Sequence, residues 1–129
     1  TEKPLAGMHF LLAEDNEINM EIAEFYLTDL GATVSKAWNG KEALELFEAS
    51  EPESYDVILM DVMMPVMDGL EATRRIRAFD PVVPIVAVTA FAYDRDRQKA
   101  LAAGANEYVA KPLSGEHIRR VLGTLLAGG

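Results

Sequence analysis

The sequence predicts an α/β fold of the doubly wound type, in which one parallel five-stranded sheet lies between two layers of helices. Two observations favour this three-layer sandwich. Short apolar runs alternate five times with segments whose apolar residues recur at helical spacing, and repeated strand–helix units form parallel sheets covered on both faces. Three of the runs are also continuously apolar, which is typical of strands in the middle of such a sheet.

Length and composition exclude several classes of protein. The chain has 129 residues, enough for one domain with its own core. It has no cysteine, which excludes a disulfide framework and thiolate metal sites, and it has no apolar run near the roughly 18 residues of a membrane span. Its net charge of −9 argues against direct binding to nucleic acid. We therefore expect a domain that contacts neither nucleic acid nor membrane.

The chain divides into a short leading segment and one domain. Residues 1–7 show no apolar periodicity, which predicts a linker over 1–7 and a domain over 8–127. Charge is unevenly distributed within that domain: residues 1–73 hold 16 acids and 3 bases, whereas residues 74–129 hold 5 acids and 9 bases. Because both halves contain periodic apolar segments, we expect them to fold together.

The strands are predicted from short apolar runs that end in a polar or turn residue. The first, third and fourth runs are continuously apolar, whereas the second and fifth are shorter or more polar, as expected at the edges of a sheet. This difference fits the spatial order 2-1-3-4-5, which is the flavodoxin-like order. The predicted strands cover residues 10–13, 33–37, 57–60, 84–88 and 108–110.

The first two helices are predicted from apolar spacing and from the residues that stop them. The first ends at Gly31, and the second is broken near Pro52. One apolar face of the first helix is marked by Ile18, Ile22, Phe25 and Leu30. The second is marked by Ala43, Leu44 and Phe47.

The last three helices carry signals at their ends. Asp68 stands three residues before Glu71, which is typical of a capping box at a helix start. The fourth helix is expected from Asp94 towards Gly104, and Ser114 can cap the fifth. The side chains of the fifth helix expected to face inward are Ile118, Val121, Leu122 and Leu125.

Five polar side chains stand at the carboxyl ends of the predicted strands. Glu14 and Asp15 follow the first strand, Asp61 the third, Thr89 the fourth and Lys111 the fifth. In a doubly wound sheet the carboxyl ends of all strands lie on the same side of the molecule. Binding sites form there, next to the point where the chain order changes between strands one and three. Three ionised carboxylates close together need their negative charge neutralised. Mg²⁺ can do this, because it takes a few carboxylates and a phosphate oxygen as ligands. We therefore predict phosphoryl transfer to Asp61, with Lys111 and Thr89 binding the phosphoryl oxygens.

Each of these residues has an ordinary explanation when it is taken alone. Adjacent acids such as Glu14 and Asp15 commonly cap a helix or lie in solvent. A single aspartate after an apolar strand is commonly a turn residue. The chemical interpretation rests on the conjunction of all five side chains at one edge of the sheet.

The motifs that contain these residues are similar to those of a known family. From residue 8 to residue 126 the chain resembles the receiver domain of two-component response regulators. Each matching stretch is modest alone, but their order and spacing are specific. The stretches are residues 12–16, 61–69, 88–90, 104–105 and 111–112.

The resemblance implies a role for each site residue. Asp61 would accept a phosphoryl group from a histidine kinase or a His-containing phosphotransfer protein, and Lys111 would pair with that group. The peptide bond between Lys111 and Pro112 would be cis. The ligands of Mg²⁺ would be Glu14, Asp15, Asp61 and the backbone carbonyl of Met63.

The resemblance also implies a switch. The Thr89 hydroxyl would move towards the phosphoryl oxygens and Tyr108 would turn inward, changing the surface of the fourth helix, fifth strand and fifth helix. The alternative for Tyr108 is an ordinary aromatic residue of an edge strand. Met63 and Phe91 occupy positions that influence phosphoryl loss to water in the family. Both side chains are apolar, so neither can position a water molecule for hydrolysis by hydrogen bonding.

Residues 5–19 and 110–113 look most like receivers attached to hybrid sensor kinases. We therefore expect a signalling domain rather than an enzyme. This domain would take part in its own phosphorylation and dephosphorylation. We expect it in the cytoplasm, where it is free or part of a membrane-bound sensor kinase and has other domains of the same chain as partners. Two alternatives are a small aspartate-nucleophile phosphohydrolase, which usually needs a second Asp where Met63 stands, and a vestigial receiver that only binds.

Overall fold

Five parallel strands form a single sheet in the computed structural model, which describes residues 3–51, 53–90, 93–111 and 113–128, with residues 124–128 described by backbone alone. Along the sheet the strands lie in the order β2-β1-β3-β4-β5. The flavodoxin-like order predicted from apolar continuity is therefore confirmed. The strands are β1 (His9–Ala13), β2 (Thr33–Ala37), β3 (Val57–Asp61), β4 (Ile85–Thr89) and β5 (Glu107–Ala110).

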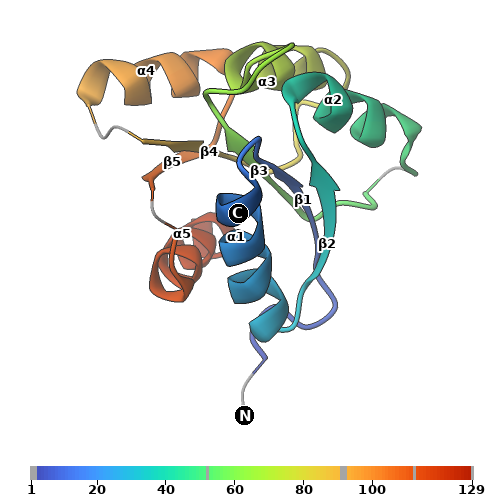
Figure 1. The fold of residues 1–129 in the computed structure, drawn as a ribbon, viewed down its shortest axis with the longest axis vertical. Coiled ribbons are helices and arrows are strands. Elements are labelled where there is room, and N and C mark those ends of the chain that lie inside the picture. The colour runs from blue at the N-terminus through green and yellow to red at the C-terminus, as the bar shows by residue number, and fades with distance from the viewer. Residues whose placement is uncertain (1–2, 52, 91–92, 112, 129) are drawn as a thin grey trace.

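Five helices cover the sheet on both faces. Figure 1 shows α1 and α5 together on one face and α2, α3 and α4 on the other, with the sheet seen nearly edge-on between them. This is the predicted doubly wound sandwich. The helices are α1 (Glu17–Asp29), α2 (Gly40–Ala49), α3 (Gly69–Phe79), α4 (Asp94–Ala103) and α5 (Gly115–Gly128).

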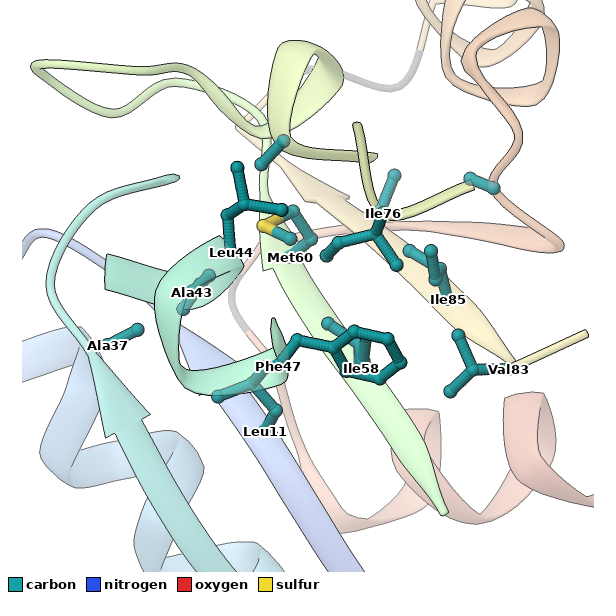
Figure 2. Packing of buried hydrophobic residues seen from close by; sticks show 14 of the residues in the cluster. Leu11, Ala37, Ala43, Leu44, Phe47, Ile58, Met60, Ile76, Val83 and Ile85 are labelled. Carbon is teal, nitrogen blue, oxygen red and sulfur yellow. The ribbon is translucent and has the colours of Figure 1, made fainter. Parts of the chain in front are cut away.

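Two apolar clusters fill the space between the sheet and its helices. The cluster under α2 and α3 is shown in Figure 2, where Phe47 of α2 and Ile76 of α3 point towards Ile58 and Ile85 of the sheet. The cluster on the other face joins α1 and α5 to the same strands and includes Leu27 and Leu122. Every residue of β3 and β4 is buried, so the two strands that carry Asp61 and Thr89 are held from both sides.

The helix ends agree with the capping signals of the sequence. Asp68 accepts a hydrogen bond from the Glu71 amide at 2.9 Å at the start of α3, and Ser114 accepts one from the His117 amide at 3.1 Å at the start of α5. Helix α4 ends at Ala103 and is capped by Gly104, whose φ of 116° is left-handed and suits glycine.

The apolar face predicted for the first helix is wrong in part. Ile18, Ile22 and Phe25 are 67%, 40% and 61% exposed. The buried residues of α1 are Met20, Ala23 and Leu27, and of the four predicted residues only Leu30, at the C-cap, is buried. The helix has apolar residues on two faces, and spacing alone does not tell which face packs on the sheet.

The leading segment makes more contacts than a linker needs. Leu5 is 4% exposed and belongs to the cluster beneath α1, and its amide donates to the Leu30 carbonyl at 2.8 Å. Lys3 donates to the carbonyl of Asp29 at 2.8 Å, at the end of α1. The boundary at residue 8 stays a prediction, and these contacts argue that residues 3–7 pack with the domain.

The end of α5 is described only in part. Ile118, Val121 and Leu122 are buried, as predicted, whereas Leu125 lies outside the residues whose side chains are described. Within the described chain, no helix has the length and apolar character needed to cross a bilayer.

Candidate functional site

Three carboxylates meet at the carboxyl ends of β1 and β3. These strands are hydrogen-bonded neighbours, so Asp61 at the end of β3 comes beside Glu14 and Asp15, which follow β1. Asp61 and Glu14 are 2% and 5% exposed, whereas Asp15 is exposed. One carboxylate oxygen from each residue lies within 4.8 Å of the other two. The structure therefore brings together the three carboxylates that the sequence assigned to one edge.

Lys111 bridges the two buried carboxylates. Its Nζ lies 2.8 Å from Glu14 Oε1 and 2.9 Å from Asp61 Oδ2. Lys111 follows β5, and β4 lies between β5 and β3, so the long lysine side chain reaches across the end of β4. Its backbone amide donates to the Thr89 carbonyl at 2.6 Å, which fixes the lysine to the same edge of the sheet.

The shared lysine and the burial give the two carboxyls opposite behaviour. Burial raises the pKa of Asp61 to about 7, against the hydrogen bond from Lys111 and with help from Glu14. Burial also acts on Glu14, but hydrogen bonds from Lys111 and the Asn16 amide outweigh it and lower the pKa of that carboxyl. Without a metal ion, Asp61 is therefore the member of the pair that takes up a proton first as the pH falls.

Lys111 keeps its charge in this setting. Burial acts to lower the pKa of Lys111, but hydrogen bonds to Glu14 and Asp61 outweigh it and raise the pKa. One ammonium group thus faces two buried carboxylates and one exposed carboxylate. The site has an excess of negative charge whenever all three carboxylates are ionised.

The residues fit a hard divalent cation. Carboxylate and carbonyl oxygens are the ligands that Mg²⁺ takes from proteins, usually with several waters retained. Glu14, Asp15 and Asp61 supply such oxygens close together, and their unbalanced charge favours a cation. The exposed side chain of Asp15 leaves the cluster open to solvent on one side.

Close backbone packing holds the carboxyl end of β3 and the loop that follows it in position. The Gly69 amide donates to the Val62 carbonyl at 3.0 Å, and a Cβ at Gly69 would clash with the backbone carbonyl of Asp61. The Gly40 amide, at the start of α2, donates to the Met67 carbonyl at 2.8 Å, and a Cβ there would also clash with that carbonyl. Two glycines therefore fix the loop that follows Asp61.

These glycines are not among the site residues predicted from the sequence. The spacing of Asp68 and Glu71 predicts only a helix cap there. Each glycine follows an Asn or Asp that caps a helix, which was the available signal. That Gly40 must also admit the Met67 carbonyl, from a segment far along the chain, is not visible in a local pattern.

Thr89 and Tyr108 lie on neighbouring strands beside the carboxylates. Thr89 ends β4 and is 4% exposed, and Tyr108 is a partly buried residue of β5. Burial raises the pKa of the Tyr108 phenol, and a hydrogen bond with Thr89 opposes this. The predicted pair is thus in direct contact, and its movement stays a prediction.

The sequence of the chain matches that of a known protein family. Residues 10–122, which contain all of the side chains above, match the model of the response regulator receiver domain. The chain belongs to this family. The resemblance stated from the sequence motifs is therefore confirmed, and the chain is a receiver domain of two-component signalling proteins.

Related receivers occur inside much longer proteins. The chain is 40% identical over 120 residues to Hybrid signal transduction histidine kinase I of Dictyostelium discoideum, with 88% of this chain covered. It spans 7% of that protein's length.

Two solved structures resemble the receiver in fold and sequence. One is the receiver domain of the sensor histidine kinase PA1611 from Pseudomonas aeruginosa, with magnesium in its active-site cleft; it has TM-score 0.84 and 41% identity, covering 96% of this chain and 100% of that one. The other comes from the complex of the Saccharomyces cerevisiae phosphotransfer protein Ypd1 with the receiver domain of the response regulator Ssk1. It has TM-score 0.82 and 31% identity, covering 88% of this chain and 85% of that one.

Two further sequence predictions concern the rim of the receiver site. Met63 is 68% exposed, and its amide lies 3.3 Å from Asp61 Oδ1. Phe91 and Pro112 lie outside the described residues, so the influence of Phe91 and the cis peptide bond before Pro112 remain predictions.

Proposed function

We propose that this receiver accepts a phosphoryl group on Asp61 from a phosphohistidine partner in the presence of Mg²⁺. One observation carries the proposal: the buried Asp61 carboxyl contacts Lys111 at 2.9 Å and lies within 4.8 Å of two more carboxylates. An acyl phosphate on an aspartate needs a cation for its oxygens and charge neutralisation around them. The carboxylates around Asp61 can bind such a cation, and Lys111 adds positive charge beside them.

The transfer step is a substitution at phosphorus. An oxygen of ionised Asp61 attacks the phosphorus atom, the P–N bond to the donor histidine breaks, and the imidazole nitrogen keeps the electron pair and takes up a proton. Because only the ionised carboxylate attacks, the raised pKa of Asp61 makes loss of its proton the first requirement. Lys111 would then transfer its hydrogen bond from Asp61 to the phosphoryl oxygens.

The proposed metal ligands are Glu14, Asp15, Asp61 and the backbone carbonyl of Met63. When bound, Mg²⁺ would supply positive charge that neutralises the carboxylates and the phosphoryl oxygens. Glu14 already accepts hydrogen bonds from Lys111 at 2.8 Å and from the Asn16 amide at 3.0 Å. Asp15 is exposed, and we therefore assign it direct contact with the ion and Glu14 contact through water.

The readout we propose uses Thr89 and Tyr108. Their hydrogen bond would break when the Thr89 hydroxyl turns to the phosphoryl oxygens, and Tyr108 would then turn inward. This exchange would change the surface formed by α4, β5 and α5. We expect Tyr108→Ala to leave phosphorylation intact and to alter the partner's response, whereas loss of phosphorylation would contradict the separation of chemistry from readout.

The exposed face of α1 offers a docking surface for the phosphodonor. Ile18, Ile22 and Phe25 follow helical spacing and are all exposed, and Ile22 lines a small hollow together with Glu14 and Lys111. The apolar stripe thus begins at the carboxylates and runs away from them. A helical phosphotransfer domain docked on this stripe would bring its histidine to Asp61, and the solved complex of a phosphotransfer protein with a related receiver supports this class of partner.

Incubation with Mg²⁺ and acetyl phosphate, followed by intact mass under rapid-quench conditions, tests the proposal. We expect one phosphoryl adduct, lost in Asp61→Asn and reduced by chelation of the metal. No adduct in freshly treated protein would favour a vestigial domain that only binds. Rapid turnover of several metabolite phosphates at catalytic protein concentration would instead favour a phosphohydrolase.

We also propose that the receiver works in the cytoplasm with other domains of the same chain. Support comes from its similarity to part of a hybrid histidine kinase, of which it spans 7%. Phosphotransfer measured within the full reading frame, compared with transfer from a separate kinase, distinguishes a hybrid kinase from an independent regulator.

A further inference from the structure

A groove lies at the end of the sheet opposite the carboxylates of the receiver site. Two adjoining hollows of about 440 and 200 Å³ form it, and Phe47, Glu53 and Asp80 line both. Further lining comes from residues just before β3 and β4 and from the ends of α2 and α3. Because β3 and β4 are parallel, their amino ends lie together on the side away from Asp61. The proposed function makes no use of this surface, which we call the acidic groove.

The acidic groove carries more negative charge than its surroundings balance. No lysine or arginine lines it in the part of the chain that the structure describes. Arg77 donates to the Asp80 carbonyl at 3.1 Å and offsets part of the charge of Asp80. The other carboxylates are exposed and form no ion pair among the described residues. The five carboxylates that line the groove are Glu48, Glu51, Glu53, Asp56 and Asp80.

Two helix ends add to this negative potential. Helices α2 and α3 both finish beside the groove, and the C-terminal end of a helix favours cations. The last turn of α2 holds no basic residue. The carboxylates and the helix ends together therefore favour a positively charged partner at this surface.

Aromatic side chains form the apolar part of the groove. The ring centroid of Phe47 lies 6.1 Å from that of Tyr55 and 5.5 Å from that of Phe79. Phe47 belongs to the core cluster of Figure 2, which anchors this row of rings to the sheet. Phe79 is 48% exposed and Val82 is 79% exposed. Both therefore leave apolar surface uncovered beside the carboxylates.

Arginine is the side chain that fits this combination. Its planar guanidinium pairs with carboxylates through two parallel hydrogen bonds and also stacks on aromatic rings, whereas a lysine ammonium is a more strongly hydrated point charge. We propose that the acidic groove is a docking site for an arginine-containing basic segment of a partner protein. An arginine of the segment lies against Phe79 and the nearby glutamates, and an apolar side chain covers Val82. This inference does not depend on phosphoryl transfer.

Binding of a defined basic peptide tests this docking site. The probe is a fluorescently labelled, end-blocked peptide of alternating arginine and leucine, and its anisotropy is measured as the whole chain is added. We expect binding that weakens as salt is added. The same peptide with lysine in place of arginine should bind several-fold more weakly, and with citrulline it should not bind. Equal binding of the citrulline peptide would overturn the proposal.

Carboxylate variants locate the peptide. Glu51→Gln combined with Glu53→Gln removes two charges from the groove and should weaken binding of the arginine peptide several-fold. Glu21→Gln combined with Glu45→Gln makes the same change in net charge at two exposed helix residues outside the groove and should leave the affinity unchanged. Equal weakening in both double variants would mean that net charge alone attracts the peptide, against the proposal.

Phe79→Ala tests the contact with the aromatic ring. Loss of the ring should remove most of the preference for the arginine peptide over the lysine peptide, and the urea midpoint checks that the fold is intact. Phe25→Ala, at a 61% exposed ring of α1, is the control and should keep the preference. An unchanged preference in Phe79→Ala would contradict the assigned position of the arginine.

Two further measurements exclude other assignments. Asp61→Asn should bind the arginine peptide as wild type does, and loss of binding would place the peptide at the receiver site and overturn the docking site, whether or not Asp61 accepts a phosphoryl group. Spermine, which has charge without a guanidinium group, should displace the peptide only weakly. Displacement as strong as that by unlabelled peptide would make a small polyamine the occupant and overturn the assignment to a protein segment.

Discussion

Two buried carboxyls share one lysine at this site, and their pKa values shift in opposite directions although burial acts to raise both. Asp61 and Glu14 are 2% and 5% exposed, and Lys111 contacts both. Glu14 has in addition the Asn16 amide at 3.0 Å, a donor that stabilises its ionised form. One backbone amide thus helps to decide which carboxyl of the metal-free protein takes up a proton first as the pH falls.

The raised pKa of Asp61 predicts how stability depends on pH when no metal is present. The carboxyl has a pKa of about 7 in the fold and the ordinary value of 3.8 in the unfolded chain. Between these values the folded protein binds more protons than the unfolded chain, so the free energy of unfolding falls as pH rises from about 4 to about 7. Urea unfolding in the presence of a chelator measures this slope.

Asp61→Asn is the control for that slope, because an amide does not titrate. We expect the variant to show a smaller decrease over the same pH range and to be more stable than wild type at pH 8. Equal slopes in the two proteins would show that Asp61 has no raised pKa. Mg²⁺ should stabilise wild type more at pH 8 than at pH 6, because binding requires the ionised carboxylate.

Asp15→Asn tests the metal assignment. The change removes the charge of an exposed carboxylate without removing its bulk, and we expect Mg²⁺ affinity to fall by tenfold or more, on the order of the losses seen when metal-site groups are altered. Metal titration followed by the fluorescence of Trp38 measures it. Asp94→Asn removes an exposed charge at the start of α4 and should leave the affinity unchanged. An unchanged titration in Asp15→Asn would show that the ion binds elsewhere.

Site residues could be predicted from the sequence when their role follows from a local pattern, such as a polar residue at the end of a strand. Asp61 and Lys111 stand at the ends of strands, and the rule that parallel strands share one functional edge places them together. Gly40 and Gly69 act through carbonyls of Met67 and Asp61. The contact of Gly40 joins segments far apart in the chain, and no local pattern contains it.

At the scale of elements, α1 shows the limit of apolar spacing as a guide. Its buried face carries Met20 and Ala23, three residues apart, and its exposed face carries Ile22 and Phe25 at the same spacing. Size and hydrophobicity favour the wrong face, and only the packing against β1 and α5 decides. We propose this exposed apolar stripe as the docking surface.

Phe25→Ala tests that surface. Because Phe25 is 61% exposed, the substitution should change the free energy of unfolding by no more than about 1 kcal/mol. We expect phosphoryl transfer from a His-containing phosphotransfer protein to slow by several-fold, with phosphorylation by acetyl phosphate unchanged. Val82→Ala, at a 79% exposed apolar residue away from α1, is the matched control. Equal slowing with both donors would mean that Phe25 acts on the site and not on docking.

At the scale of the whole molecule, the charge asymmetry has a structural counterpart. The acid-rich half contributes the three carboxylates, and the other half contributes Thr89 at the end of β4 and Lys111 just after β5. The two halves therefore meet at one site, and the asymmetry does not mark a tail. The strand order could be predicted because apolar continuity separates central strands from edges, whereas the packing of Leu5 could not, because a single leucine has no periodicity.

Leu5→Ala tests whether the leading segment belongs to the folded unit. Leu5 is 4% exposed, and removal of a buried leucine side chain typically costs about 2–5 kcal/mol. We expect a lower urea midpoint with an unchanged slope. Leu46→Ala, at a 37% exposed leucine of α2, should cost much less. Similar stability of Leu5→Ala and wild type would support a linker over residues 1–7.

The most direct test of the central claim locates the phosphoryl group. Protein phosphorylated by acetyl phosphate with Mg²⁺ is reduced with borohydride, which converts an aspartyl phosphate to homoserine, and peptides are sequenced by mass spectrometry. The account predicts homoserine at position 61, absent when a chelator replaces Mg²⁺. Homoserine at another aspartate, or none at position 61 under conditions that give a phosphoryl adduct, would contradict it.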